Sequence, residues 1–177
     1  GEMQYKSGDC YTGNWKRDKK DGNGHVKYSN GGIYEGQFKK GKKHGKGRLE
    51  FTNDDVYEGD YYKGKKHGKG KYLWKNGAIY IGDYVNGKKE GNGNIKYENG
   101  DEYIGQMGNG KRNGIGREIW VNGEEYKGNW INDKRCGIGK VIHSNGEEYE
   151  GEYIDDMKEG KGTQITHKLT YCGQFKE

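Results

Sequence analysis

Basic residues recur in adjacent pairs along this chain, and a regular row of ammonium and guanidinium groups attracts anions. The pairs follow one another at intervals of 23 residues, and thirteen of their fourteen positions hold Lys or Arg. In order they are Lys19-Lys20, Lys42-Lys43, Lys65-Lys66, Lys88-Lys89, Lys111-Arg112, Lys134-Arg135 and Met157-Lys158. We place every pair in the same turn of successive β-hairpins, which predicts one basic edge with a pair every ~9.5 Å. Such an edge suits an anionic phospholipid surface or an acidic partner, and it equally suits turns that only solubilise the sheet edge.

Histidine and cysteine give a weaker indication of metal binding. His44 and His67 lie one repeat apart, and the ~9.5 Å between stacked hairpins is too long for both to bind one zinc ion. His167 and Cys172 flank the last turn, and two ligands do not complete a site within one chain. A metal held between two chains by His167 and Cys172 stays an open alternative, and we otherwise expect no cofactor.

Catalytic patterns are absent from the sequence. It contains no Gly-x(4)-Gly-Lys-Ser/Thr, no Cys-x-x-Cys and no recognisable Ser-His-Asp arrangement. The Gly-x-Gly elements are expected to lie within strands, so no helix N-terminus follows them to bind phosphate. We therefore expect that the chain is not an enzyme.

The composition is unusual for a folded domain. Apolar residues make up 28% and charged residues 33%, against roughly 45–50% and about 25% in globular proteins. Sixteen tyrosines, four tryptophans and periodic glycines nevertheless argue against disorder. Three scattered cysteines favour a reducing compartment, so we expect a cytoplasmic protein.

A repeat of 23 residues organises the whole chain. The unit Tyr-x-Gly-x-aromatic starts at residues 11, 34, 57, 80, 103, 126 and 149, and again after 22 residues at 171. Taking the first Tyr as repeat position 1, glycine holds position 3 in all eight copies and positions 12 and 14 in the seven complete ones. We predict one continuous array over residues 1–177, with partial copies at 1–10 and 171–177, and we expect it to be a piece of a longer array.

Two turn signals per copy predict one β-hairpin per repeat. One is Asn-Gly at positions 20–21, and the other lies around positions 7–10, as in Lys40-Gly41-Lys42-Lys43. A three-residue loop with a left-handed glycine at the Asn-Gly signal places all the aromatics on one face. In the copy at Tyr34, we then expect Tyr34 opposite Leu49, Gly36 opposite Gly47 and Phe38 opposite Gly45. The rings would lie over bare glycine backbone.

The repeated phrase Tyr-Glu-Gly-Gln-Phe-x(6)-Gly-Lys-Gly resembles the MORN repeat (membrane occupation and recognition nexus), and the resemblance covers essentially the whole chain. Met107, His143 and Glu118 depart from the aromatic or apolar pattern. The resemblance implies an all-β fold, an elongated and twisted single-layer antiparallel meander of stacked hairpins. It further implies scaffolding, self-association and partner docking at membranes or cytoskeleton. The abundance of Lys and Asn suggests a protist, where similar proteins are associated with cell division.

Three surfaces are candidates for binding. The aromatic face could receive a peptide or helix, or be only the core; it comprises Tyr34, Phe38, Tyr57, Tyr61, Trp74, Tyr80, Tyr84 and Tyr97. The opposite face becomes apolar towards the C-terminus, which predicts an antiparallel dimer or reflects only the high β-propensity of isoleucine; its residues are Ile104, Ile115, Ile119, Ile138, Ile142 and Ile165. The basic edge is the possible anionic-lipid site, with Lys42, Lys43, Lys65, Lys66, Lys88, Lys89, Lys111 and Arg112. Nucleic acid is not expected, because the cations lie on an edge while the rings line a face.

The leading hypothesis is therefore a non-catalytic scaffold that self-associates and docks proteins at the cytoskeleton or membrane periphery. The alternative is a peripheral module that binds anionic phospholipid or phosphoinositide through its lysine edge. High salt separates the two, because it weakens contacts between lysines and lipid and leaves contacts between isoleucines in place.

Overall fold

The computed structural model describes residues 1–176, which are β-strands joined by short turns. They divide into two compact units, residues 1–88 and residues 89 onward. The strands that make up the first unit are β1 (Glu2–Gln4), β2 (Cys10–Lys16), β3 (Lys19–Lys27), β4 (Ile33–Lys39), β5 (Lys42–Glu50), β6 (Val56–Tyr62), β7 (Lys65–Leu73) and β8 (Ile79–Val85). The strands of the second are β9 (Lys88–Lys96), β10 (Glu102–Gly108), β11 (Lys111–Ile119), β12 (Glu125–Ile131), β13 (Lys134–Ile142), β14 (Glu148–Ile154), β15 (Met157–Ile165) and β16 (Thr170–Lys176).

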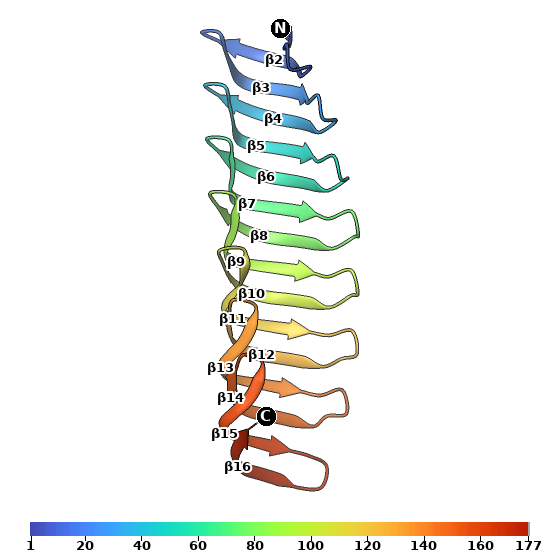
Figure 1. Cartoon of the computed structure of the whole chain (residues 1–177), viewed down its shortest axis with the longest axis vertical. Coiled ribbons are helices and arrows are strands. Elements are labelled where there is room, and N and C mark those ends of the chain that lie inside the picture. The colour runs from blue at the N-terminus through green and yellow to red at the C-terminus, as the bar shows by residue number, and fades with distance from the viewer. Residues whose placement is uncertain (177) are drawn as a thin grey trace. The chain divides into compact units, whose positions relative to one another are not determined.

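Within each unit every strand pairs antiparallel with the next strand in the sequence (Figure 1). The predicted all-β meander of hairpins is confirmed. Each hairpin has an inner face, defined here as the face that carries the tyrosine of repeat position 1, and an outer face opposite.

The Asn-Gly loop follows the prediction. Val26 pairs with Tyr34, and the backbone N–H of Tyr28 donates to the carbonyl of Gly32 at 2.9 Å. Three residues remain in the loop, and Gly31 has φ +96°. This geometry is a three-residue hairpin loop closed by a left-handed glycine.

The lysine turn is shorter than predicted. Lys39 pairs with Lys42, so the turn contains only Lys40 and Gly41, with φ values of 51° and 82°. Positive φ at both central residues matches a type I′ hairpin turn. The basic pair at positions 9 and 10 therefore belongs to strand β5, and its placement in the turn was wrong.

A β-bulge separates this turn from the glycines in the hairpins β2–β3, β4–β5, β6–β7, β10–β11, β12–β13 and β14–β15. In β4 the register shifts between Gly36 and Phe38, so Phe38 pairs with Lys43 within its hairpin. The predicted pairing of Phe38 with Gly45 was wrong, because Gly45 pairs with Tyr61 of the next hairpin. The bulge adds residues on the second strand and lets the tight turn close.

The core is a row of tyrosines seated on glycines. All seven position-1 tyrosines from Tyr11 to Tyr149 are completely buried. Gly36 and Gly47 face each other as predicted, and a Cβ atom on Gly47 would lie 2.3 Å from the Tyr34 hydroxyl. The glycines thus provide the space that the ring occupies.

Candidate partner-binding surfaces

The buried tyrosine hydroxyl and a backbone carbonyl in the bulge are hydrogen-bond partners. The bulge leaves the position-4 carbonyl without a strand partner, and the position-1 hydroxyl donates to it, as from Tyr34 to Gln37 at 3.0 Å and from Tyr103 to Gln106 at 2.7 Å. The position-4 side chain bonds in turn to the backbone across the hairpin. Gln106 accepts from the Ile115 N–H at 2.8 Å, whereas the Asn129 amide donates to the Ile138 carbonyl at 3.0 Å. Neither bond was predicted from the sequence. A signal for the side-chain bond was present, because position 4 is Asn, Gln, Asp or Glu in every copy.

Most of the predicted aromatic face is buried by the chain itself. Six of its eight rings are at most 6% exposed, namely Tyr34, Phe38, Tyr57, Tyr61, Tyr80 and Tyr84. They pack edge to face, with centroids 5.1 Å apart for Tyr34–Phe38 and 5.3 Å for Tyr34–Tyr61. Such geometry is typical of core aromatic pairs. These six rings present no surface to a partner, and only Trp74 and Tyr97 of the predicted set are half-buried.

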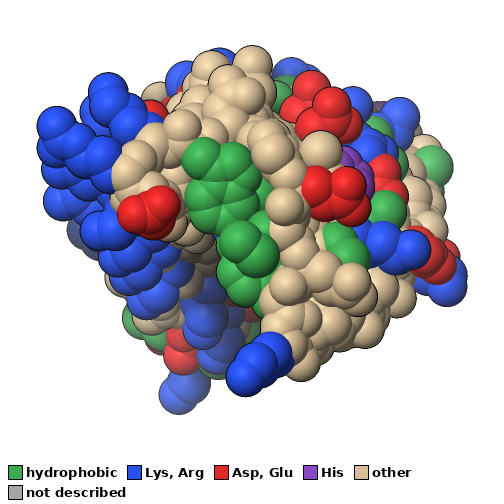
Figure 2. Space-filling view, turned by 90° about the horizontal axis from the view of Figure 1, so that it is seen from above, with side chains coloured by type: hydrophobic (Ala, Val, Ile, Leu, Met, Phe, Trp, Pro, Cys, Tyr) green, Lys and Arg blue, Asp and Glu red, His purple; other side chains and the backbone are tan. Residues whose placement is uncertain are grey.

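The basic pairs split between two environments. The position-9 residues of the predicted lipid edge are exposed, namely Lys42, Lys65, Lys88 and Lys111. The position-10 residues are half-buried and turn towards the inner face, namely Lys43, Lys66, Lys89 and Arg112. Figure 2 shows lysine and arginine side chains gathered on one side of the molecule. The prediction that both members of each pair form one exposed edge was wrong, because successive strand residues point to opposite faces.

Position-10 cations cover the rings. The Lys66 Nζ atom lies 4.2 Å from the Tyr72 centroid and 4.7 Å from that of Tyr57, and the Lys43 Nζ atom lies 4.9 Å from that of Tyr34. These distances fit cation–π interactions. Burial lowers the pKa of Lys43. Burial also lowers the pKa of Lys89, although the charge of Asp133 acts in the opposite direction.

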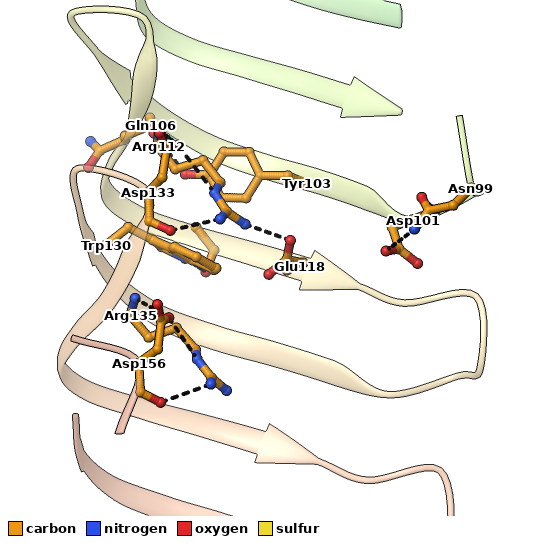
Figure 3. A network of polar contacts seen from close by, with 11 residues as sticks. Asn99, Asp101, Tyr103, Gln106, Arg112, Glu118, Trp130, Asp133, Arg135 and Asp156 are labelled. Atoms are coloured by element: carbon orange, nitrogen blue, oxygen red, sulfur yellow. Dashed lines mark hydrogen bonds and ion pairs between the residues drawn. The ribbon is translucent and has the colours of Figure 1, made fainter. Parts of the chain in front are cut away.

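In the second unit arginine at position 10 is paired with acid (Figure 3). The Arg112 guanidinium donates to Glu118 at 2.5 Å and to the Asp133 carbonyl at 2.7 Å, and it lies 4.0 Å from the Trp130 ring centroid. Glu118 is only 8% exposed, and burial raises its pKa against the opposing charge of Arg112. Glu118, a departure from the apolar pattern, therefore has a partner in the same strand.

Aspartates at position 22 tie their own loop to the loop of the next hairpin. Asp9 accepts from the backbone N–H of Ser29 at 2.8 Å, Asp55 from that of Lys75 at 2.9 Å, and Asp101 from that of Val121 at 2.9 Å. In each case the donor is the position-19 amide. Position 22 is Gly32 in one copy of the first unit and Ala78 in another.

The predicted self-association surface is partly exposed. On the outer face of the second unit, Ile115 is 62% exposed and Ile138 56%, followed by Ile104 and Ile165 at 45% and 43%. Ile119 and Ile142 are half-buried beside neighbouring glutamates. A cavity of about 480 Å³ opens on this face, lined by Ile138, Lys140, Glu148, Glu150, Gly151, Thr163 and Ile165.

The candidate metal ligands are at the end of the chain. His167 and Cys172 are both exposed. Within residues 1–176 no three His, Cys, Asp or Glu side chains gather as a metal site would require. No helix in the same residues has the length and hydropathy needed to cross a membrane.

The repeat matches a known family model. The MORN repeat model matches residues 11–33, 34–56, 57–79, 80–102, 103–125, 126–148 and 149–165. The chain belongs to the MORN repeat family. The predicted family is confirmed, with the predicted number and extent of complete repeats, and MORN repeats form a non-catalytic β-repeat scaffold. No curated protein sequence matches this MORN chain.

Among solved structures, this MORN chain is similar to the TCP domain of SAS-4 (dCPAP) of Drosophila melanogaster, solved in complex with a proline-rich motif of Ana2 (dSTIL). Identity is 10% and the TM-score 0.54, over 99% of this chain and 89% of that one. The wild-type TCP10 domain of Danio rerio CPAP has 9% identity and a TM-score of 0.26, over 86% and 94%. The first likeness supports the fold, and the second adds nothing to it.

Proposed function

We propose that this MORN chain is a non-catalytic scaffold that self-associates through the outer face of its second unit. In this proposal, it docks protein partners at membrane-associated cytoskeletal structures, including those of cell division. The observation that carries the proposal is the set of exposed isoleucines on a face whose repeat does not require them. The corresponding positions in the first unit include Lys46 and Lys69 where the second unit has Ile115 and Ile138.

The energetics of this face favour burial. These isoleucines are about half exposed, so covering one contributes about 1–2 kcal/mol, and a two-fold dimer counts each residue twice. Flanking ion pairs supply a polar rim, as Arg117 with Glu125 at 2.5 Å and Lys140 with Glu148 at 2.5 Å. An apolar centre with a polar rim is typical of protein interfaces.

Docking of protein segments has support from the fold. The TCP domain of SAS-4, which shares this architecture, is described in complex with a proline-rich motif of another protein. Because the position-1 and position-5 rings between Tyr34 and Tyr153 are buried, docking on that part of the inner face has to use the half-buried position-18 rings and their neighbours.

Analytical ultracentrifugation tests self-association directly. We expect the wild-type chain to form a dimer with rising concentration and the variant Ile115→Lys/Ile138→Lys to stay monomeric, because two buried unpaired charges per protomer oppose the interface. Ile81→Lys is the matched control, since Ile81 lies on the outer face of the first unit with the same 56% exposure as Ile138. Equal association of both variants would place any interface elsewhere.

The alternative function is binding of anionic phospholipid through the exposed position-9 lysines. Vesicle sedimentation tests it with Lys42→Glu/Lys65→Glu, which should lose binding if these side chains contact lipid. Binding that survives high salt, or survives this double substitution, argues against the lipid role because screening weakens exposed charge contacts.

A further inference from the structure

One half-buried lysine on the inner face of the first unit has no anionic partner. The Lys43 Nζ atom lies among the rings of Tyr34, Tyr28 and Tyr61 at 4.9, 5.4 and 5.6 Å from their centroids. It makes no ion pair with a residue of the described chain, and burial alone shifts its pKa downward. Burying an ammonium group without a carboxylate is unfavourable.

A cavity of about 230 Å³ opens beside this lysine. Its lining combines apolar side chains with polar groups, namely Tyr28, Asn30, Gly32, Lys43, Leu49, Glu50, Phe51 and Thr52. Glu50 does not neutralise Lys43, because its carboxylate pairs with Arg48. The lining therefore holds the Lys43 cation and one carboxylate, that of Glu50, which is already paired with Arg48.

The preceding copy shows what occupies the equivalent place. There, a cavity is lined by Asp9 and Lys20, which correspond to Gly32 and Lys43. The Asp9 carboxylate accepts from the Ser29 amide, and the charge of Lys20 contributes to holding its pKa low, after the Ser29 hydrogen bond. In this copy, therefore, a carboxylate accepts from the position-19 amide, and the charge of the position-10 cation lowers its pKa.

The following copy repeats that arrangement with Asp55. Its carboxylate accepts from the Lys75 amide at 2.9 Å and from the Tyr72 hydroxyl at 2.7 Å. Burial raises the pKa of Asp55, but these hydrogen bonds and the charge of Lys66 hold it below its usual value. Two copies on either side of Gly32 therefore supply their own carboxylate.

At Gly32 both donors are present and the carboxylate is missing. The equivalent amide is that of Thr52, which donates no hydrogen bond to any residue among 1–176. The Lys43 ammonium is the equivalent cation. A carboxylate placed here would satisfy both groups, as Asp9 and Asp55 do in their copies.

We propose that the cavity beside Lys43 receives an aspartate or glutamate side chain from an acidic segment of a partner protein. This inference rests on the proposed docking function and names the chemistry of the partner. The single cation and the apolar walls of Leu49 and Phe51 suit one carboxylate on a peptide with neighbouring apolar groups. A lipid phosphate would instead require the several cations that the exposed position-9 row provides.

The test uses displayed short peptides randomised around one fixed Asp, with a matched library in which Asn replaces it. Peptides selected on the wild-type chain are expected to bind at least about tenfold more tightly than their Asn counterparts, because a charged hydrogen-bonded pair is lost. Amide NMR should show the Thr52 signal moving on titration with the selected peptide. Equal affinity of Asp and Asn peptides overturns the proposal.

Substitutions at Gly32 distinguish a filled cavity from a damaged fold. Gly32→Asp places a carboxylate where Asp55 has one, so it should lower peptide binding by about tenfold or more while raising the melting temperature. Gly32→Ala is the control, because Ala78 occupies that position naturally in another copy. It should bind peptide within about threefold of wild type, a small difference on the scale of affinities. Undiminished binding by Gly32→Asp overturns the proposal.

Two lysine variants complete the experiment. Lys43→Met should abolish the preference for Asp over Asn, whereas Lys42→Gln, which changes the exposed neighbour, should keep it. If Gly32→Asp and Lys43→Met reduce binding to phosphatidylserine vesicles and leave peptide binding intact, the cavity serves lipid and the proposal is wrong. A wild-type chain that dimerises but binds Asp and Asn peptides equally would reject this site and leave the proposed scaffold function standing.

Discussion

At the scale of residues, the position-1 tyrosine explains why the repeat is rich in glycine. Its ring occupies the space above paired glycines, and its hydroxyl satisfies the bulge carbonyl. The seat was predictable from the spacing of Tyr and Gly. The hydroxyl bond was not predicted, because it depends on a bulge that alternating hydrophobicity does not reveal. A buried carbonyl without this bond would cost about 1–3 kcal/mol.

Replacing one seat glycine should be far more damaging than replacing a turn glycine. Gly47→Ala places a Cβ atom 2.3 Å from the Tyr34 hydroxyl, so the ring must leave its seat at a cost of about 3 kcal/mol or more. Gly64→Ala meets nothing within 4 Å and has only the strain of φ +92°, about 1 kcal/mol. Urea unfolding measures both, and equal losses would refute ring seating as the main role of Gly47.

Alkaline pH should unfold the chain as the buried tyrosines ionise. Burial raises the pKa of Tyr126 to about 12, above its ordinary value of 10.0. Its contribution is therefore fully present below pH 10 and is lost as pH rises from 10 to about 12. Urea midpoints measured across this range should fall, and Tyr126→Phe should make the fall shallower. A flat stability profile in this range would contradict the burial of the phenols.

At the scale of elements, the hairpin was predicted in its loop and only approximately in its turn. The length of the Asn-Gly loop could be predicted because only a three-residue loop places the aromatic residues of both strands on the same face. The lysine turn could be placed at several positions, because Lys and Gly are compatible with each of them. Because the turn ends two residues earlier than predicted, Lys43 and Lys66 lie in strands and over rings, which the sequence pattern alone did not distinguish from an exposed edge.

The Arg112 network should behave as a buried ion pair within the hairpins of the second unit. Arg112→Met leaves Glu118 buried without its cation and should destabilise the chain by about 3 kcal/mol. The double variant Arg112→Met/Glu118→Leu should regain most of this, since position 16 holds Leu49 in another copy. Arg48→Met, which breaks the exposed pair with Glu50, should cost less than about 1 kcal/mol. Equal losses in the two single variants by urea unfolding would contradict the network.

At the scale of the whole molecule, the surfaces available for binding are the side chains that are not used in the aromatic core. The family, the repeat and the strand pattern could be predicted from the sequence because every copy contains the same tyrosine, glycine and turn signals. The sequence did not distinguish buried rings from rings that a partner could contact, because ring exposure depends on how the position-10 side chains lie over neighbouring hairpins. The Lys43 cavity became apparent only when the copies were compared in three dimensions, where Asp9 and Asp55 show the group that Gly32 lacks.

Self-association through apolar side chains is the central claim, and the mass of the wild-type chain in solution tests it most directly. Static light scattering at low and high salt should give about twice the chain mass of 20.2 kDa in both. Contacts between isoleucines persist when charges are screened. A chain that stays at its single mass at all concentrations, or a dimer that separates in high salt, would contradict the claim.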